Sequence, residues 1–366
     1  MKIGLYSPYW DTMGGGEKYM LDLARCFPED EIVFFGAEKD LMSKAKERFG
    51  FSHKNVSAIF DIKKNDGKLI KDKFKNLDLF FYQCDGSIFI PSAKKNILLI
   101  QSPVHSPQGG IKDKIKLFFW QKIICNSEFT AKVVRKKTGA SPAILNPAVD
   151  RIPILKKENI ILSVGRFFPH LHSKKQEVLI EIFKKLTPSY RLCLVGAVAS
   201  SDREYLKDLK EQAKNYQIDF FENVSFEKIR ELYGSAKIFW HAAGYGEDLK
   251  KFPERAEHFG IATIEAISAG CYPLVFKAGG QKEILGNNPE FYWETKEELL
   301  EKTKNLITNY ELPVRNASPA SHASQGNAGW HSDAGGRIKN YEKKLKIITE
   351  KYLFESFKKK LYEIIQ

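Results

Sequence analysis

The alternation of short apolar runs with amphipathic helical stretches constrains the fold of this chain more than any other feature. Early in the chain, the run Lys2–Tyr6 precedes a helical stretch, Glu17–Cys26, whose apolar residues recur at helical spacing. Further strands are expected at Ile32–Phe35, Leu79–Tyr82, Ile97–Ile100 and Ile123–Asn126, and a basic amphipathic helix at Lys112–Lys122. Strands that alternate with helices are typical of a parallel sheet covered by helices, so the sequence predicts an α/β fold.

A second series of the same kind begins after Asn146-Pro147. The expected strands are Ile160–Val164, Arg191–Val195, Phe220–Asn223, Ile238–His241 and Tyr272–Phe276, and the expected helices are Lys175–Leu186, Glu204–Tyr216, Phe226–Ser235, Ile261–Ala269, Glu297–Thr308 and Tyr341–Ile365. The proline-containing segment 147–158 is the best linker candidate, and a length of 366 residues agrees with two domains. Residues Asn316–Gly336 have almost no large aliphatic side chains, so we expect a flexible loop or an insertion there.

The chain is basic, with 58 Lys and Arg against 45 Asp and Glu and a formal net charge of +13. The surplus is +7 in residues 1–150, +1 in residues 151–299 and +5 in residues 300–366. This balance excludes an acidic, halophile-like protein and leaves nucleic acid, an anionic membrane surface or a phosphorylated substrate as partner classes. Because a nucleic-acid binder more often concentrates its charge in one stripe, we expect no nucleic-acid partner.

The cysteines and the apolar segments indicate the compartment. Five cysteines without a CxxC pair argue against a disulfide framework or a zinc site. The start of the chain lacks the apolar run of a signal peptide, and no stretch approaches the ~18 apolar residues of a membrane-spanning helix. We therefore expect a cytoplasmic protein.

Two glycine-containing turns follow expected strands. Gly14-Gly15-Gly16-Glu17 leads into a helix, where glycines let the backbone approach a ligand and the helix start offers N–H groups to an anion. A plain tight turn is the alternative. Gly165-Arg166 follows a strand, and Lys174-Lys175 lies at the next helix start. Cations at the carboxyl edge of a parallel sheet suit a diphosphate, although a solvated basic loop would have the same sequence.

Two carboxylates eight positions apart, Glu257 and Glu265, lie before and within an expected helix. Carboxylates accept bonds from vicinal hydroxyls, so this pair could hold a sugar and a ribose, with the Phe259 and Gly260 N–H groups between them. Stray glutamates on a surface helix are the alternative, but the apolar neighbours of Glu265 make a fully solvated position less favourable.

His105 lies in a loop after a strand, where a lone histidine is more often structural or solvated than catalytic. His170 and His172 could bind a metal, but no third ligand is evident. No Asp-x-Asp sequence occurs in the chain, which disfavours a metal-held nucleotide diphosphate. We expect no metal site.

These motifs together resemble glycosyltransferase family 4, a retaining family with the GT-B fold. The resemblance is carried, in order, by Gly14–Glu17, Ser163–Gln176, Pro253–Pro273 and Ala278–Ile284, and it covers about residues 1–310 and the final helix. It implies two Rossmann-like domains that face a central cleft. Residues 1–150, joined by a C-terminal helix at about 350–366, would bind the acceptor, and residues 151–349 would bind a nucleotide-sugar donor.

The resemblance also implies roles for single residues. Glu257 would hold hydroxyls of the donor sugar and Glu265 those of the ribose. Arg166 and Lys174 would neutralise the diphosphate, with Lys175 as the fallback for Lys174. Gly15, Gly16, Phe259 and Gly260 would supply backbone contacts to the donor. Many members carry a histidine in a loop of the first domain near the donor sugar, and here either His105 or Gln101 could face it.

The expected activity is therefore retaining, metal-independent transfer of a hexose from a UDP- or GDP-sugar, with no cofactor. The acceptor would be a glycan or a lipid-linked glycan of cell-envelope polysaccharide biosynthesis. The surplus charge lies on the expected acceptor domain and the tail, which favours an anionic membrane surface as a further partner and a peripheral position on the inner face of the membrane. The alternatives are a GT-B epimerase or phosphorylase, or a non-catalytic protein that binds nucleotide sugars or polyanions.

Overall fold

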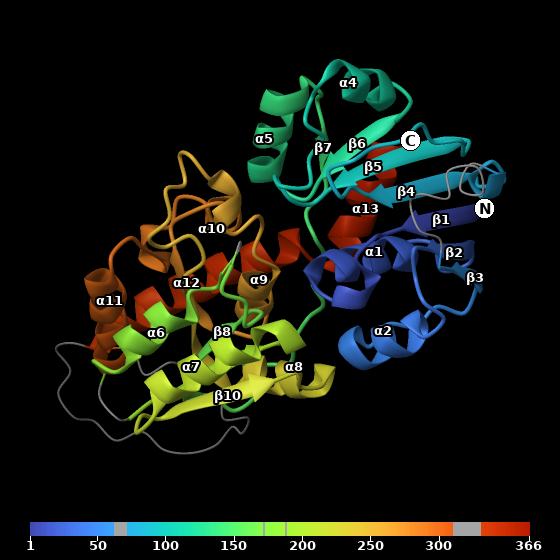
Figure 1. Ribbon diagram of the computed structural model, residues 1–366. Coiled ribbons are helices and arrows are strands. Elements are labelled where there is room, and N and C mark those ends of the chain that lie inside the picture. Colours follow the sequence, from blue (N-terminus) through green and yellow to red (C-terminus); the bar gives the residue numbers. More distant parts are fainter. Residues whose placement is uncertain (62–71, 171–172, 187–188, 310–330) are drawn as a thin grey trace. The chain divides into compact units, whose positions relative to one another are not determined.

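The computed structural model describes residues 1–61, 72–170, 173–186, 189–309 and 331–366, with only the backbone described at residues 309 and 331–340. The chain divides into two compact units, Met1–Val149 with Tyr352–Gln366, and Asp150–Lys351. Each unit is a parallel sheet with helices packed against it (Figure 1), which confirms the predicted α/β class.

The sheet of the first unit has the strand order β3-β2-β1-β4-β5-β6-β7. Its strands are β1 (Lys2–Tyr6), β2 (Glu31–Phe35), β3 (Val56–Phe60), β4 (Leu79–Gln83), β5 (Lys95–Ile100), β6 (Lys122–Cys125) and β7 (Ala143–Ile144). The helices are α1 (Gly15–Arg25), α2 (Leu41–Phe49), α4 (Ile111–Leu117), α5 (Glu128–Thr138) and α13 (Phe354–Ile365). The central strands are buried on both faces, which explains why they are almost continuously apolar in sequence.

The last helix, α13, belongs to the first unit although it follows the second in sequence. Its Phe357 ring meets the Tyr19 ring of α1 edge-on at 5.5 Å, and the Tyr362 hydroxyl donates to the Cys26 carbonyl at 2.7 Å. The chain end is thus packed into the same apolar core as β1 and α1.

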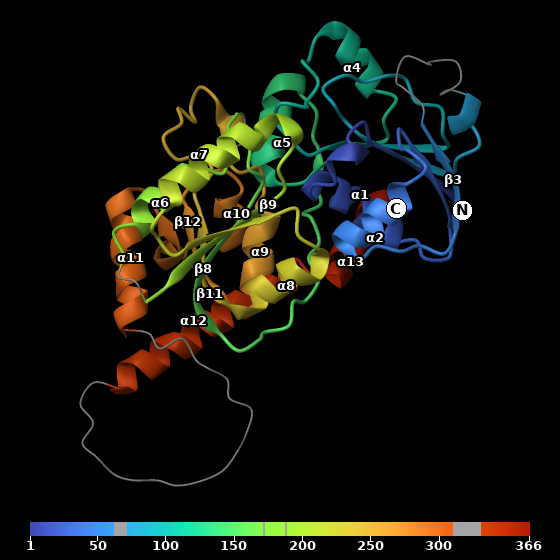
Figure 2. The same ribbon diagram turned by 60° about the horizontal axis from the view of Figure 1, so that its bottom comes forward.

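The sheet of the second unit has the order β10-β9-β8-β11-β12-β13. Its strands are β8 (Glu158–Val164), β9 (Arg191–Gly196), β10 (Ile218–Glu222), β11 (Ala236–His241), β12 (Tyr272–Phe276) and β13 (Tyr292–Trp293). The helices are α6 (Gln176–Phe183), α7 (Arg203–Ala213), α8 (Phe226–Ser235), α9 (Ile261–Ser268), α10 (Gln281–Leu285), α11 (Lys296–Asn309) and α12 (His331–Lys351). Figure 2 shows α12 beside α9, and these two helices are in contact.

Several sequence-based boundaries are wrong. The expected helix Tyr341–Ile365 is two helices, because the helix is interrupted at Tyr352-Leu353. There the Tyr352 carbonyl accepts a hydrogen bond from the Val149 N–H at 2.8 Å. The break lies where the chain passes from one unit to the other. The expected loop Asn316–Gly336 ends in helix from His331 onward, and its residues 316–330 lie outside the described residues.

The basic helix is also shorter than expected. It spans Ile111–Leu117 rather than Lys112–Lys122, because Trp120 turns into the core and β6 begins at Lys122. Within the described ranges, no helix is both long and apolar enough to cross a membrane.

Candidate functional site

In the second unit, β8 and β11 are neighbours, and their carboxyl ends lie at the same edge of the sheet. The strand after β8 in sequence, β9, lies on the other side of β8, so the order of the sheet changes direction between β8 and β11. Ligands of open parallel sheets bind at the carboxyl ends of the strands at such a switch point. The residues that follow β8 and end β11 are Gly165-Arg166 and His241, so this edge carries the candidate site.

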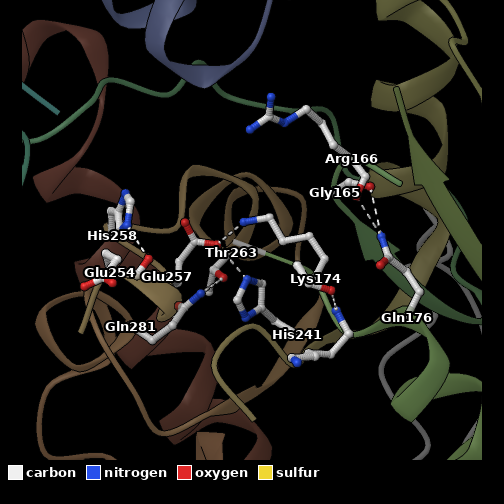
Figure 3. Close-up of polar contacts among 12 residues, drawn as sticks. Gly165, Arg166, Lys174, Gln176, His241, Glu254, Glu257, His258, Thr263 and Gln281 are labelled. Atoms are coloured by element: carbon white, nitrogen blue, oxygen red, sulfur yellow. Dashed lines mark hydrogen bonds and ion pairs between the residues drawn. The ribbon is translucent and has the colours of Figure 1, made fainter. Parts of the chain in front are cut away.

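Glu257 is the centre of the polar contacts at this edge (Figure 3). It lies in the loop between the short helix Pro253–Arg255 and α9. The Lys174 ammonium donates to its Oε2 atom at 2.5 Å, and the His241 Nε2 atom lies 2.8 Å from the same oxygen. The carboxylate is 16% exposed, Lys174 22% and His241 3%, so the three groups are largely withdrawn from water.

The charge states of these groups follow from their surroundings. Burial alone would raise the pKa of Glu257, but the Lys174 charge and the bond to His241 outweigh burial and hold that pKa well below its usual range. Burial lowers the pKa of His241 despite its bond to the carboxylate. The site therefore holds an ionised Glu257 beside a neutral imidazole at neutral pH.

The backbone of Glu257 is fixed by the turn after β12. The Gly280 N–H donates to the Glu257 carbonyl at 2.8 Å. A Cβ atom at Gly279 would lie 2.1 Å from that carbonyl oxygen, and Gly279 has a positive φ of 56°. Only glycine fits such an approach without strain, so the Ala278-Gly279-Gly280 turn holds the Glu257 loop in place.

The stem of Lys174 packs against Gly165. A Cβ atom at Gly165 would lie 2.5 Å from the Lys174 Cγ atom. The Gln176 amide donates to the carbonyls of Gly165 and Arg166 at 3.3 and 3.0 Å, which ties the start of α6 to the end of β8. These contacts at the end of β8 thus position the Lys174 side chain beside Glu257.

Lys175 points to a different carboxylate. Its ammonium lies 2.6 Å from Glu247, whose other oxygen binds Arg255 at 2.7 Å. The geometry favours Lys174 over Lys175 as the cation beside Glu257. Arg166 is exposed, and Figure 3 shows its side chain extended away from the Glu257 contacts.

The remaining predicted residues of this unit lie around α9. Gly260 has a positive φ of 116°, and a Cβ atom there would lie 2.8 Å from the buried Gln281 amide. Phe259 is buried. Glu265 is half-buried and accepts a bond from the Tyr233 hydroxyl at 3.1 Å, so it is not a stray surface glutamate.

In the first unit, Gly15 and Gly16 form the first turn of α1 rather than the loop before it. The helix starts earlier than predicted because the Glu17 carboxylate accepts a hydrogen bond from the Gly14 N–H at 2.9 Å. This bond gives a partner to a backbone N–H group at the N-terminus of the helix. The Gln101 amide donates to the Gly16 carbonyl at 3.2 Å. Gln101 is therefore in contact with the glycine turn.

His105 packs on an aromatic ring instead. Its ring stacks on Tyr9 with centroids 5.0 Å apart, and burial lowers its pKa. It lies in the same unit as Gly15, Gly16 and Gln101.

Sequence reasoning missed His241. It is the last residue of an expected strand, Ile238–His241, where every neighbour is apolar. A polar residue at the carboxyl end of a buried parallel strand was the signal that could have found it. Among the described residues, no group of three or more His, Cys, Asp or Glu is placed to hold a metal ion.

Residues 148–321 match the family model described as "Glycosyl transferases group 1". An uncharacterised glycosyltransferase of Methanocaldococcus jannaschii is 30% identical over 143 residues, which is 39% of this chain and 33% of that protein. The human GDP-Man:Man(3)GlcNAc(2)-PP-Dol alpha-1,2-mannosyltransferase is 26% identical over 232 residues, which is 54% of this chain and 44% of the human protein. These matches support a glycosyltransferase. The chain spans less than half the length of either of these two relatives.

Solved glycosyltransferase structures match almost the whole chain. Anabaena Alr3699/HepE in complex with UDP has a TM-score of 0.72 at 16% identity and covers 99% of both chains. WaaG, a glycosyltransferase involved in lipopolysaccharide biosynthesis, has a TM-score of 0.58 at 13% identity and covers 100% of both. At this identity the likeness shows the fold, which is GT-B, and nothing beyond it.

Proposed function

We propose that this protein is a retaining, metal-independent hexosyltransferase of the glycosyltransferase family 4 type. It would move a hexose from a nucleotide-sugar donor to a glycan or lipid-linked acceptor in cell-envelope polysaccharide biosynthesis. The observation that carries the proposal is the Glu257 carboxylate, ionised and held by Lys174 at the carboxyl edge of the sheet. The family match and the UDP bound in Alr3699/HepE support the same reading.

In this proposal the second unit binds the donor. Glu257 accepts bonds from the sugar hydroxyls, and Glu265 accepts bonds from the ribose. Lys174 and Arg166 carry the positive charge that stabilises the leaving diphosphate. Negative charge builds up on that group as the sugar–phosphate bond breaks, so fixed cations there accelerate the step. The Phe259 and Gly260 backbone lies at the start of α9, whose N-terminal dipole favours the same negative charge.

The first unit would bind the acceptor. Gly15 and Gly16 at the start of α1 would offer backbone contacts to the donor phosphates, and Gln101, which contacts this turn, is favoured over His105 as its neighbour. The sugar would pass through an oxocarbenium-like state. With retention and no nucleophile assigned, the leaving phosphate would take the proton of the acceptor hydroxyl.

Glu257→Ala tests the assignment of donor binding. The variant should lose sugar transfer while its thermal unfolding stays cooperative, and Glu254→Ala, in the short helix Pro253–Arg255 that precedes this loop, should keep it. Full transfer by Glu257→Ala would overturn the assignment. Turnover of a nucleotide sugar without acceptor would instead indicate an epimerase, and dependence on inorganic phosphate a phosphorylase.

The same assay with EDTA tests metal independence. Transfer should be unchanged, because the proposal assigns the diphosphate charge to Lys174 and Arg166. Complete loss that Mg²⁺ or Mn²⁺ restores would show a metal-dependent enzyme.

An anionic membrane surface is the further partner we propose, and α4 is the proposed contact. The helix and the turn after it expose Ile111 (80%), Ile115 (57%), Phe118 (87%) and Phe119 (42%), with Lys112 and Lys114 between them. Exposed apolar bulk among lysines suits the boundary between anionic headgroups and acyl chains. Such a contact would place the protein on the inner face of the membrane.

Vesicle sedimentation tests this surface. The protein should bind phosphatidylcholine vesicles that contain phosphatidylglycerol, and binding should fall with salt. Phe118→Ser with Phe119→Ser should weaken it, whereas Ile347→Ser, an exposed apolar residue of the second unit (56%), should not. Absent or salt-independent binding would remove the membrane from the proposal.

A further inference from the structure

His241 is a buried histidine with one bonded and one unbonded nitrogen. Nε2 lies 2.8 Å from the Glu257 Oε2 atom. Because the carboxylate is ionised and the imidazole is neutral, the single ring proton must be on Nε2, which donates it. Nδ1 is then a bare acceptor, and it is buried without a hydrogen-bond partner among the described residues.

A buried acceptor without a partner is unfavourable for folding. An apolar side chain of similar volume would fill the end of β11 without that penalty. The imidazole therefore contributes something other than packing, and its one polar contact is with Glu257.

That contact orients the carboxylate. Lys174 and His241 both donate to Oε2, so rotation of the Glu257 carboxylate would break two bonds. In the part of the chain that the structure describes, no hydrogen bond or ion pair reaches Oε1. Figure 3 shows the two donors on one side of the carboxylate and the second oxygen turned away from them.

The two donors differ in stiffness. Lys174 reaches Glu257 through a long, flexible chain and is 22% exposed. His241 is a short ring at the end of a central strand, 3% exposed, and it cannot follow the carboxylate if that group moves. The imidazole is thus the donor that fixes direction, and the ammonium is the donor that supplies charge.

We infer that His241 is a positioning residue whose Nε2–H holds the Glu257 carboxylate with Oε1 toward the hydroxyls of the donor sugar. The inference rests on the proposed role of Glu257 and adds a residue to it. It predicts that His241 affects recognition of the sugar and leaves recognition of the nucleotide diphosphate intact.

Three variants test this role: His241→Leu, which keeps the volume, His241→Gln, whose amide can place a donor near the Nε2 position, and His53→Leu as control. His53 bonds the Phe27 carbonyl at 3.1 Å in the first unit. A bond to a charged group corresponds to a factor of roughly 10 to 150, so His241→Leu should lower kcat/KM for the nucleotide sugar by about that factor. His241→Gln should recover part of the loss, and His53→Leu should match the wild type.

Nucleotide affinity separates positioning from general damage. The Kd of the nucleoside diphosphate without sugar should stay within about threefold of the wild type in His241→Leu, since a change of that size is below 1 kcal/mol. An unchanged kcat/KM in His241→Leu would overturn the inference. An equal loss of affinity for nucleotide and nucleotide sugar would show a structural role instead, and would also overturn it.

The ring nitrogens give a readout that does not depend on activity. In 15N-histidine NMR spectra of the full chain, His241 should show a protonated Nε2 and an unprotonated Nδ1 between pH 7 and 8. Lys174 and Glu257 are the charged groups that act on this ring. A proton on Nδ1, or on both nitrogens, would refute the inference even in an active enzyme. If the wild type transfers no sugar, the proposed function fails, while the spectrum still reports whether the pair exists.

Discussion

The packing of Gly165 against Lys174 predicts that one added methyl group displaces the cation of the site without removing its charge. In Gly165→Ala, the new Cβ atom would lie 2.5 Å from the Lys174 Cγ atom and 3.3 Å from its Cβ atom. Ordinary contact begins at 3.4 Å, so Cγ must retreat by about 0.9 Å. Gly165 does not have a positive φ, so the added methyl acts through the lysine stem rather than through backbone strain.

The expected loss of kcat/KM follows from the Lys174–Glu257 bond that this shift would break. The Lys174 ammonium lies 2.5 Å from the Glu257 oxygen, and we expect the shift of the stem carbons near Gly165 to draw it out of this contact. A hydrogen bond between charged groups contributes about 1.5–3 kcal/mol, so kcat/KM should fall roughly 10- to 150-fold. The crowding itself should lower the free energy of unfolding by about 1–3 kcal/mol.

The assay combines steady-state kinetics, nucleoside diphosphate binding and urea unfolding. Both kcat/KM and nucleotide affinity should fall, because Lys174 is the proposed diphosphate ligand. Gly110→Ala is the matched control, since a Cβ atom there meets nothing within 4 Å. The double variant Gly165→Ala/Lys174→Ala should be no worse than Lys174→Ala alone, because the methyl group then has little stem left to displace.

Two outcomes would refute this reasoning. Wild-type kcat/KM and nucleotide affinity in Gly165→Ala would show that the position of Lys174 does not matter to the site. Independent, additive losses in the double variant would show that the methyl group acts somewhere other than on the lysine.

Three further predictions concern charge and binding. The pKa of Glu257 is lower in the folded than in the unfolded protein. The ionised carboxylate therefore adds to the free energy of unfolding above about pH 4.5, and this contribution is lost as the pH falls through the pKa of the folded state. The difference in unfolding free energy between wild type and Glu257→Gln should thus shrink below pH 4.5, and a difference that grows in acid would contradict the ion pair. Lys157 is buried and donates to the Ala236 and Ala269 carbonyls at 2.7 and 2.6 Å, so Lys157→Met should lower urea stability by about 2–4 kcal/mol, whereas exposed Lys156→Met should have no effect. In a thermal-shift panel of UDP, GDP, ADP and their sugars, one nucleotide series should raise Tm, and no shift with any of them would contradict donor binding.

The α/β class was predictable because it depends on local patterns. Each buried parallel strand must be apolar on both faces, and each surface helix needs one apolar stripe, so the sequence displays the elements directly. The boundaries of the helices were harder to predict from the sequence. The break at Tyr352-Leu353 has no Gly or Pro, and it arises from a hydrogen bond to a residue about 200 positions earlier.

The candidate site divides in the same way. Glu257, Arg166 and the lysine pair were predictable as chemical types, because acids and cations next to glycine turns after strands are visible in the sequence. The sequence left Lys174 and Lys175 almost equivalent. The fold separates them, since Gly165 packs against the first and Glu247 binds the second.

The sequence by itself determined the kinds of groups at the site and the type of sheet that carries them, because residue type and periodicity are local properties. Only the tertiary structure decided which groups meet. It brought His241, from the end of β11, to a carboxylate 16 residues away, and it removed both from water so that one became neutral and the other stayed charged. The physical reason is that burial and proximity set protonation and direction, and both are properties of the packed chain.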